Sequence, residues 1–175
     1  MTGEAPEAPP PWWPVTTTKF VVMTLGTLGM YQYFWIWENW RRLHQLRGEA
    51  VSPMWRVMFA PFTSYRLFDL ARDSGREQNV WRGWSAVGVA ALYFIAHIAL
   101  FVGVPAWFTG AVLLLPVLPV QITMAKVNAK VAPNAPRNGT ITPANLAMLV
   151  GGALLTAAAY SYDSQVDQLL KEWNP

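Results

Sequence analysis

Four long apolar stretches follow one another along the chain, at residues 20–40, 85–104, 107–123 and 144–160. Charged or proline-containing segments separate them. A helix rises about 1.5 Å per residue, so roughly 20 apolar residues cross the ~30 Å hydrocarbon core of a bilayer. The pattern therefore predicts an all-α fold: a polytopic integral membrane bundle of about four spans, within a transmembrane domain at residues 19–160.

Glycines interrupt two of these stretches. Gly26 and Gly29 lie near the middle of the first, where glycine permits either close contact with a neighbouring helix or a break. We expect one continuous span over residues 20–40, and a re-entrant hairpin broken at the glycines is the alternative. Gly151 and Gly152 lie among alanines in the fourth stretch, which predicts that this helix packs against protein on at least one face.

Residues 52–74 are too interrupted to cross a bilayer. The apolar run inside this segment has only nine residues, Arg56 and Arg66 bound it, and Pro61 lies within it. A short apolar run with arginines at both ends favours a helix that lies in the membrane surface. We therefore predict a Pro-kinked interfacial helix at the inner face of the membrane.

Both ends of the chain are predicted to be tails. Residues 1–18 are rich in proline, which excludes a helix and favours extended, polyproline-like chain. This segment is either a tether or a docking segment for a partner. No basic residue precedes Lys19, so a secretory signal is not expected. Residues 161–175 form a weakly acidic C-terminal tail that could fold as a short surface helix.

Composition and charge agree with a membrane protein. The chain is 53% hydrophobic and 13% charged, whereas a soluble domain is about 25% charged. Eight of the thirteen basic residues are arginines within residues 41–82, but acidic side chains and apolar stretches interleave with them. We therefore expect a lipid bilayer as partner, together with a membrane-protein partner or a second copy of the chain, and no nucleic acid.

Tryptophan and arginine gather where the predicted spans end, which is typical of a membrane–water interface. The expected interface residues are Trp35, Trp37, Trp40, Arg41, Arg42, Trp55, Arg56, Arg66, Trp81, Arg82 and Trp84. The loops at residues 41–82 and 124–143 carry eleven of the thirteen basic residues and are predicted to be cytoplasmic. A continuous first span then places both termini outside, whereas a re-entrant hairpin brings the N-terminus inside.

His97 is the one ionisable side chain in the interior of a predicted span. A histidine at membrane depth serves either a proton or solute path or a hydrogen bond between helices. We expect the structural role, because no carboxylate or second histidine accompanies it. The chain has no cysteine, and no catalytic, metal or cofactor motif is recognisable in it. We therefore expect neither an enzyme nor a bound cofactor.

Four short motifs carry a resemblance to a known group of proteins. They are Thr-Leu-Gly-x-Tyr at 27–31, Glu-Asn-Trp at 38–40, Trp-Arg-x-x-Phe-Ala-Pro-Phe at 55–62 and Ala-Pro-Arg-Asn at 135–138. Together they resemble small bacterial inner-membrane proteins with a domain of unknown function, over most of residues 19–150. The resemblance implies the bacterial inner (cytoplasmic) membrane as location, and it implies no activity, cofactor or site residue.

Polar groups are sparse at membrane depth, and this favours a non-enzymatic scaffold or an accessory subunit of a membrane complex. The alternative is a small transporter, channel or lipid-handling protein. In that case His97, Pro61 and the two prolines of the third stretch, Pro116 and Pro119, would line a pathway.

Overall fold

The computed structural model describes residues 9–48, 52–100, 105 and 108–173, and the regular structure of these residues is helical. The helices are α1 (Thr17–Gly26), α2 (Tyr31–Arg47), α3 (Pro53–Met58), α4 (Ala60–Glu77), α5 (Ala86–Ala99), α6 (Thr109–Val131) and α7 (Pro143–Trp173). The predicted all-α fold is confirmed. Extended pairing within the described residues is confined to one parallel bridge, between Val15 and Asn138.

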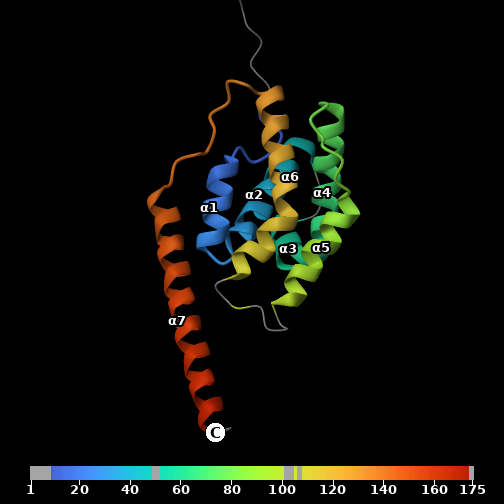
Figure 1. Ribbon diagram of the computed structural model, residues 1–175. Coiled ribbons are helices and arrows are strands. Elements are labelled where there is room, and N and C mark those ends of the chain that lie inside the picture. Colours follow the sequence, from blue (N-terminus) through green and yellow to red (C-terminus); the bar gives the residue numbers. More distant parts are fainter. Residues whose placement is uncertain (1–8, 49–51, 101–104, 106–107, 174–175) are drawn as a thin grey trace, which may run out of the picture.

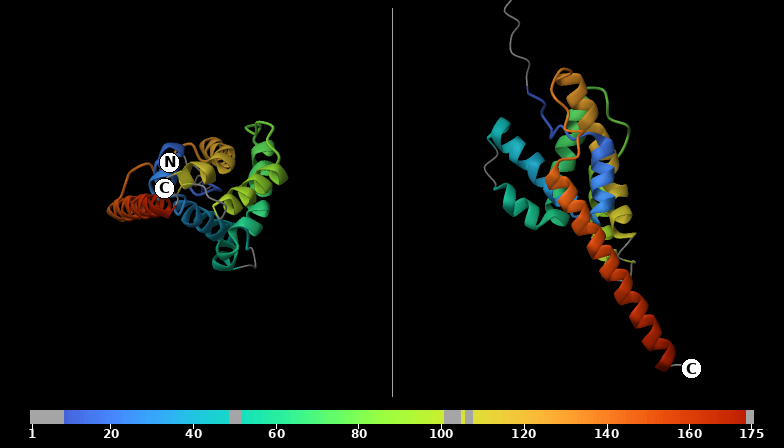
Figure 2. Two further views of the ribbon diagram at one scale, coloured as in Figure 1. Left: turned by 60° about the horizontal axis from the view of Figure 1, so that its bottom comes forward. Right: turned by 90° about the vertical axis from the view of Figure 1, so that its left-hand side faces the viewer.

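Helices α1 to α6 form a bundle, and α7 lies along one side of it (Figure 1). α1 packs on α6, α6 packs on α4 and α5, and α4 pairs with α5. α7 lies beside α1 and extends well beyond the bundle (Figure 2). The largest fully buried side chains of the core are aromatic: Phe20 contacts Trp35 with ring centroids 5.1 Å apart, and Phe68 contacts Tyr93 at 5.8 Å.

The first apolar stretch is broken, so the predicted continuous span over residues 20–40 is wrong. Leu28 and Gly29, in the turn between α1 and α2, have left-handed φ angles of 53° and 88°. Glycine adopts this conformation without strain because it lacks a Cβ atom. The Thr27 hydroxyl donates to the carbonyl of Met23 at 2.7 Å and accepts from the amide of Tyr31 at 2.9 Å. One side chain thus satisfies the facing ends of both helices.

The two helices diverge from this turn as the arms of a hairpin (Figure 2). The chain before α1 returns to the C-terminal half of α2: the amide of Trp13 donates to Asn39 Oδ1 at 3.0 Å, and Arg42 Nε donates to the carbonyl of Pro10. Both outer ends of the hairpin therefore lie at one end of the bundle, as the broken-hairpin alternative requires. With ten residues, α1 is only about 15 Å long.

Residues 52–74 contain two helices in place of one kinked helix. The chain turns at Phe59, whose φ and ψ of −109° and 33° leave the helical region. Pro61 follows in the first turn of α4, where a missing backbone N–H costs nothing. The Thr63 hydroxyl donates to the carbonyls of Phe59 at 3.0 Å and Arg56 at 2.5 Å, and so ties α3 to α4. The proline begins a helix, and the change of direction precedes it.

α5 and α6 correspond to the second and third predicted stretches where the structure describes them. The expected end of the second at residue 104 and the expected start of the third at residue 107 lie outside the described residues. α6 extends eight residues further than the predicted end at residue 123, and it continues through Pro116 and Pro119.

α7 continues past the predicted end of the fourth stretch at residue 160 as far as Trp173, the last described residue. The described part of residues 161–175 is therefore the second half of one long helix rather than a separate tail. The hydroxyls of Ser161 and Ser164 donate to main-chain carbonyls of the preceding turn, at 2.9 and 2.8 Å. These polar residues thus continue the helix without a break.

Two helices of the described chain are long and apolar enough to cross a membrane. They are α6, with 23 residues, and the Pro143–Lys171 part of α7, with 29 residues; their most apolar 18-residue windows have mean hydropathies of 1.7 and 1.4. α5 is apolar but has 14 residues. The most apolar part of α6 is 56% buried, as in a core helix, whereas that of α7 is 11% buried. An exposed apolar helix of this length is typical of contact with lipid or with another protein.

Candidate functional site

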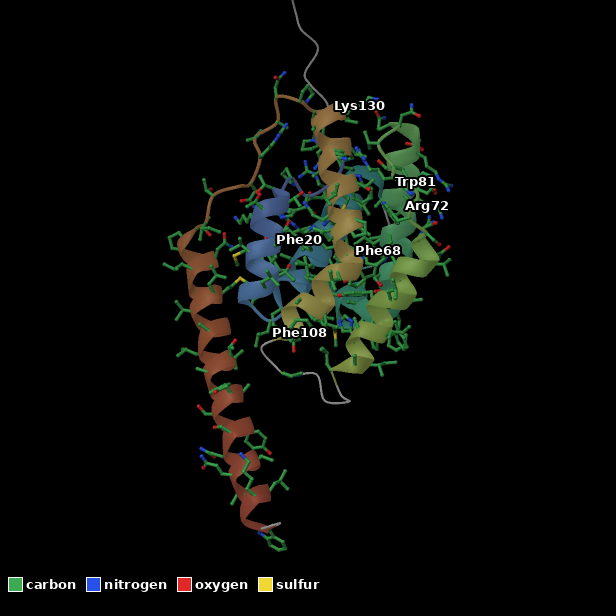
Figure 3. The ribbon with its side chains drawn as sticks, viewed as in Figure 1. Phe20, Phe68, Arg72, Trp81, Phe108 and Lys130 are labelled. Atoms are coloured by element: carbon green, nitrogen blue, oxygen red, sulfur yellow. The ribbon has the colours of Figure 1, made fainter. Side chains whose placement is uncertain are left out.

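One end of the bundle carries Arg76, Lys130 and Arg137, and we call it the basic end: the C-terminal ends of α4 and α6 and the loop at 132–142. Lys130 Nζ donates to the carbonyl of Gln78 at 2.7 Å and so joins the ends of α6 and α4. The Arg76 guanidinium lies 4.5 Å from the ring centroid of Trp81. Figure 3 shows Lys130, Trp81 and Arg72 toward this end and Phe108 at the opposite one.

An extended N-terminal segment, residues 9–16, packs into the basic end, and we call it the strap. Trp12 is fully buried. The side-chain amide of Asn128 in α6 pairs with both the main-chain N–H and the main-chain carbonyl of Trp12. The amide of Trp12 donates to Asn128 Oδ1 at 3.0 Å, and Asn128 Nδ2 donates to the carbonyl of Trp12 at 2.9 Å. The indole Nε1 of Trp12 donates to Ser74 Oγ at 3.3 Å. The strap is therefore part of the fold, not a free tail.

Two further amide side chains hold the strap to α2 and α6. Asn39 accepts from the amide of Trp13 and donates through Nδ2 to the carbonyl of Trp35 at 2.9 Å. Gln121 donates through Nε2 to the carbonyl of Val15 at 3.0 Å and accepts from Trp35 Nε1 at 2.7 Å. Trp35 thus lies in the core at this junction, although the sequence predicted it for the membrane interface.

The loop after α6 covers the strap from the other side. The amide of Asn138 donates to the carbonyl of Pro14 at 2.9 Å, and the amide of Thr16 donates to the carbonyl of Asn138 at 3.2 Å. Lys19, 3% exposed, donates through Nζ to Asn138 Oδ1 and to the carbonyl of Thr140, both at 2.7 Å. Both partners are neutral, and burial lowers the pKa of Lys19.

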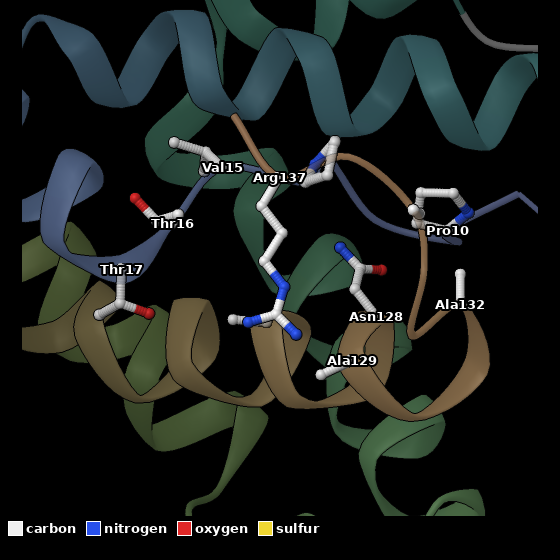
Figure 4. Close-up of a pocket in the computed structure, with 11 residues that line it drawn as sticks. Pro10, Val15, Thr16, Thr17, Asn128, Ala129, Ala132 and Arg137 are labelled. Atoms are coloured by element: carbon white, nitrogen blue, oxygen red, sulfur yellow. The ribbon is translucent and has the colours of Figure 1, made fainter. Parts of the chain in front are cut away.

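A small cavity of about 170 Å³ remains between the strap, the first turn of α1 and α6. Figure 4 shows Pro10 and Val15 of the strap and Asn128 of α6 around it, and the Arg137 side chain extends from the loop toward α6. The cavity is large enough for several water molecules.

Two of the predicted interface arginines, Arg41 and Arg56, contact aromatic rings, and Arg41 also pairs with Glu38. Arg41 pairs with Glu38 at 2.6 Å, and its guanidinium lies 5.5 Å from the ring centroid of Trp37. The Arg56 guanidinium stacks 3.6 Å from the ring centroid of Trp40. These are cation–π geometries that fix each arginine against its neighbour.

Four other predicted interface residues differ in their surroundings: Trp81 and Trp84 are hydrogen-bonded, whereas Arg82 and Trp55 are exposed. Trp81 Nε1 donates to the carbonyl of Trp84 at 3.0 Å, and Trp84 Nε1 donates to Thr123 Oγ1 of α6 at 3.0 Å. Arg82 between them is exposed. Trp55 of α3 lies exposed on the outer surface, 57% accessible.

A groove of about 250 Å³ opens where α2, α3 and α4 meet, and we call it the aromatic groove. It is lined by Trp40, Trp55, Arg56, Phe62, Thr63, Tyr65 and Arg66. Among the described residues that line it, four are aromatic and two are arginines.

His97 lies between α5 and α2 with both ring nitrogens in hydrogen bonds. Its Nδ1 is 2.8 Å from the carbonyl of Tyr93, which can only accept. Nδ1 therefore carries the proton in the neutral ring, and Nε2 accepts from the hydroxyl of Tyr33 at 3.1 Å. The Tyr93 ring stands edge-on to the imidazole, with centroids 4.4 Å apart. This arrangement joins two helices, and His97 lines none of the cavities described above.

The glycines predicted for helix packing differ in their surroundings. A Cβ atom built on Gly152 of α7 would overlap the carbonyl oxygen of Gly26 and lie 2.9 Å from Thr27 Cα, so α7 and α1 cross here in backbone contact. A Cβ atom on Gly29 would overlap the side chain of Leu113 in α6. Gly151 has no atom within 4 Å of such a position.

No metal site is apparent in the part of the chain that the structure describes: no group of three His, Cys, Asp or Glu side chains could hold an ion. No family model, no curated protein and no solved structure matches the chain. The resemblance to small bacterial inner-membrane proteins stays a prediction.

The amide side chains that hold the strap, on Asn39, Gln121 and Asn128, were not predicted from the sequence. Gln121 lies within the predicted third span, and Asn128 continues the same helix. A polar side chain in an apolar helix is rarely without a partner. Gln121 alone could therefore have indicated that another segment hydrogen-bonds to this helix. Its partner Val15, 106 residues away, could not have been named.

Proposed function

We propose that the chain is a multi-pass protein of the bacterial inner membrane that serves as a non-enzymatic scaffold or accessory subunit of a membrane complex. The observation that carries the proposal is the exposed apolar helix α7. It contacts the bundle through α1 near Gly26 and Gly152. Large apolar side chains away from this contact are exposed, among them Val150, Leu154 and Leu155. A helix of this kind presents its free side to lipid and to a neighbouring membrane protein.

In this proposal α5, α6 and α7 cross the bilayer, and the α1–α2 hairpin enters it from the basic end without crossing. These are four membrane-inserted segments, of which the first is re-entrant. The positive-inside rule assigns the basic end to the cytoplasm. The strap joins that end through Asn128 and Asn138, so the N-terminus is cytoplasmic and α7 leads to the outside.

The surroundings of His97 favour the scaffold over a transport pathway. A residue on a pathway must contact water or solute, whereas the imidazole of His97 is engaged by Tyr33 and by the carbonyl of Tyr93. The prolines of α6 do not line a pathway either: Pro116 and Pro119 border neither the cavity beside the strap nor the aromatic groove, and Pro116 is buried.

Site-specific photo-crosslinking along α7 tests the proposal. A photoreactive amino acid at Leu154, on the exposed side, should give one crosslinked product of defined mass, either with another membrane protein or with a second copy of the chain. The matched control is Leu149, whose side chain contacts the position of Gly26, and it should give only an intramolecular product. Absence of any intermolecular product at Leu154 in native membranes would contradict the scaffold function.

A further inference from the structure

A shallow pocket of about 750 Å³ opens between the loop after α4 and the C-terminal half of α6, and we call it the Arg82 pocket. Asn79, Val80, Trp81 and Arg82 line it from the loop, and Lys126 lines it from α6. Two positive charges from different elements therefore border one depression. Neither of these two basic side chains has an ion-pair or hydrogen-bond partner among the described residues, so their N–H groups are available to a ligand.

The loop that carries Arg82 is attached to α6 by its two tryptophans. Trp81 Nε1 donates to the carbonyl of Trp84 at 3.0 Å, and Trp84 Nε1 donates to Thr123 Oγ1 of α6 at 3.0 Å. Thr123 lies one turn before Lys126 on the same helix. The backbone positions of Arg82 and Lys126 are thus fixed relative to each other before a ligand arrives, which lowers the entropy lost on binding.

In the proposed membrane arrangement, the pocket lies at the depth of the lipid headgroups. α6 crosses the bilayer from Thr109, and Lys126 follows about 25 Å further along the helix axis at 1.5 Å per residue. Because the hydrocarbon core is ~30 Å thick, Lys126 lies near its cytoplasmic boundary. Trp84 contacts α6 one turn below Lys126, and indole rings and basic side chains both favour this zone.

The segments around the pocket carry an excess of positive charge. Residues 76–82 and 126–130 contain four basic side chains and one acidic side chain, Glu77. Lys130 donates to a main-chain carbonyl and Arg76 stacks on an indole ring, and both of these partners are neutral. Their positive charges therefore add to those of the two basic residues that line the pocket, and the pocket favours an anion.

We propose that the Arg82 pocket binds the phosphate group of an anionic phospholipid from the cytoplasmic leaflet. The Arg82 guanidinium offers two parallel N–H groups to the phosphate oxygens, and the Lys126 ammonium adds a compact positive charge with three donors. α5 begins directly after the loop and exposes the apolar side chains of Val87 and Leu92, which offer a surface to acyl chains. A zwitterionic headgroup would bring a cation toward two basic side chains. The inference rests on the proposed membrane location.

Native mass spectrometry of the full chain in mild detergent, with equimolar phosphatidylglycerol and phosphatidylcholine, tests the site. One phosphatidylglycerol should bind in preference. Arg82→Gln and Lys126→Gln should each weaken its binding about tenfold, because each removes a charge-assisted hydrogen bond to the phosphate. Arg82 is exposed, so its replacement does not threaten folding. The matched control, Arg137→Gln, removes an exposed positive charge at the same end but outside the pocket and should leave binding unchanged.

Three outcomes overturn the site: phosphatidylcholine binding as tightly as phosphatidylglycerol, Arg137→Gln weakening binding as much as Arg82→Gln, or the water-soluble headgroup glycerophosphoglycerol competing as well as the lipid. The last would identify a soluble phosphate ligand. Alkaline extraction of cell membranes separates this test from the membrane proposal. A chain that is released by alkali refutes the membrane location, whereas a chain that stays in the membrane but shows no lipid preference refutes only the Arg82 pocket.

Discussion

Replacing Asn128 with alanine should detach the strap from the bundle. The change removes two buried hydrogen bonds, at 3.0 and 2.9 Å, and leaves the N–H and C=O of the fully buried Trp12 without their partner. Each unsatisfied buried group costs about 1–3 kcal/mol. Asn128 also borders the cavity of about 170 Å³, so water can replace part of the pairing. We therefore expect a loss of about 2–5 kcal/mol in the free energy of unfolding.

Reversible unfolding in mixed micelles, followed by tryptophan fluorescence, measures this loss. Ala129→Ser, at the exposed next position of α6, is the matched control and should change the free energy of unfolding by less than about 0.5 kcal/mol. Hydrogen exchange at the amide of Trp12 should accelerate in Asn128→Ala and not in the control. A loss below about 0.5 kcal/mol with unchanged exchange would show that the strap is not held by Asn128, and the described junction would be wrong.

Two more substitutions test other contacts. Gly152→Ala should weaken the packing of α7 on α1 by about 1–3 kcal/mol, because the added Cβ atom meets the backbone of α1. Gly151→Ala, at the next position, should be neutral. Equal effects of the two changes in a thermal-unfolding assay would exclude the backbone contact between α7 and α1. His97→Leu should cost about 0.6–2 kcal/mol of helix association through the lost hydrogen bond from Tyr33, and His97→Gln should be better tolerated. A His97→Gln protein that assembles normally but fails to complement a deletion strain would favour transport instead.

α5 and α6 were predictable because each coincides with an apolar run. α5 also begins at a local cap, where Ser85 accepts from the amide of Gly88 at 3.2 Å. The sequence could not decide whether the first apolar stretch is one continuous span or a broken hairpin, because Gly26 and Gly29 permit both. In the observed hairpin these glycines make contacts distant in sequence: Gly29 lies against Leu113, and Gly26 lies against α7.

The strap was misjudged for a related reason. Proline-rich chain has no helix period and no internal hydrogen bonds, so composition alone describes it as a tail. Its main-chain groups are satisfied by Asn39, Gln121 and Asn128, side chains that come from two helices far along the chain. Local patterns cannot reveal such pairs. The same holds for His97: its two candidate roles, a transport pathway and a hydrogen bond between helices, could be separated only once Tyr33 was found beside it.

Single-cysteine labelling tests the proposed membrane arrangement most directly, because the chain has no cysteine of its own. Cysteine at Pro9 in the strap and at Gly139 in the loop after α6 should be protected from an impermeant maleimide in intact spheroplasts and react after lysis. Cysteine at Ser164, beyond the bundle on α7, should react from outside in intact spheroplasts. Labelling of Gly139→Cys and Ser164→Cys from the same side would show that α7 does not cross the membrane and would contradict the proposed arrangement.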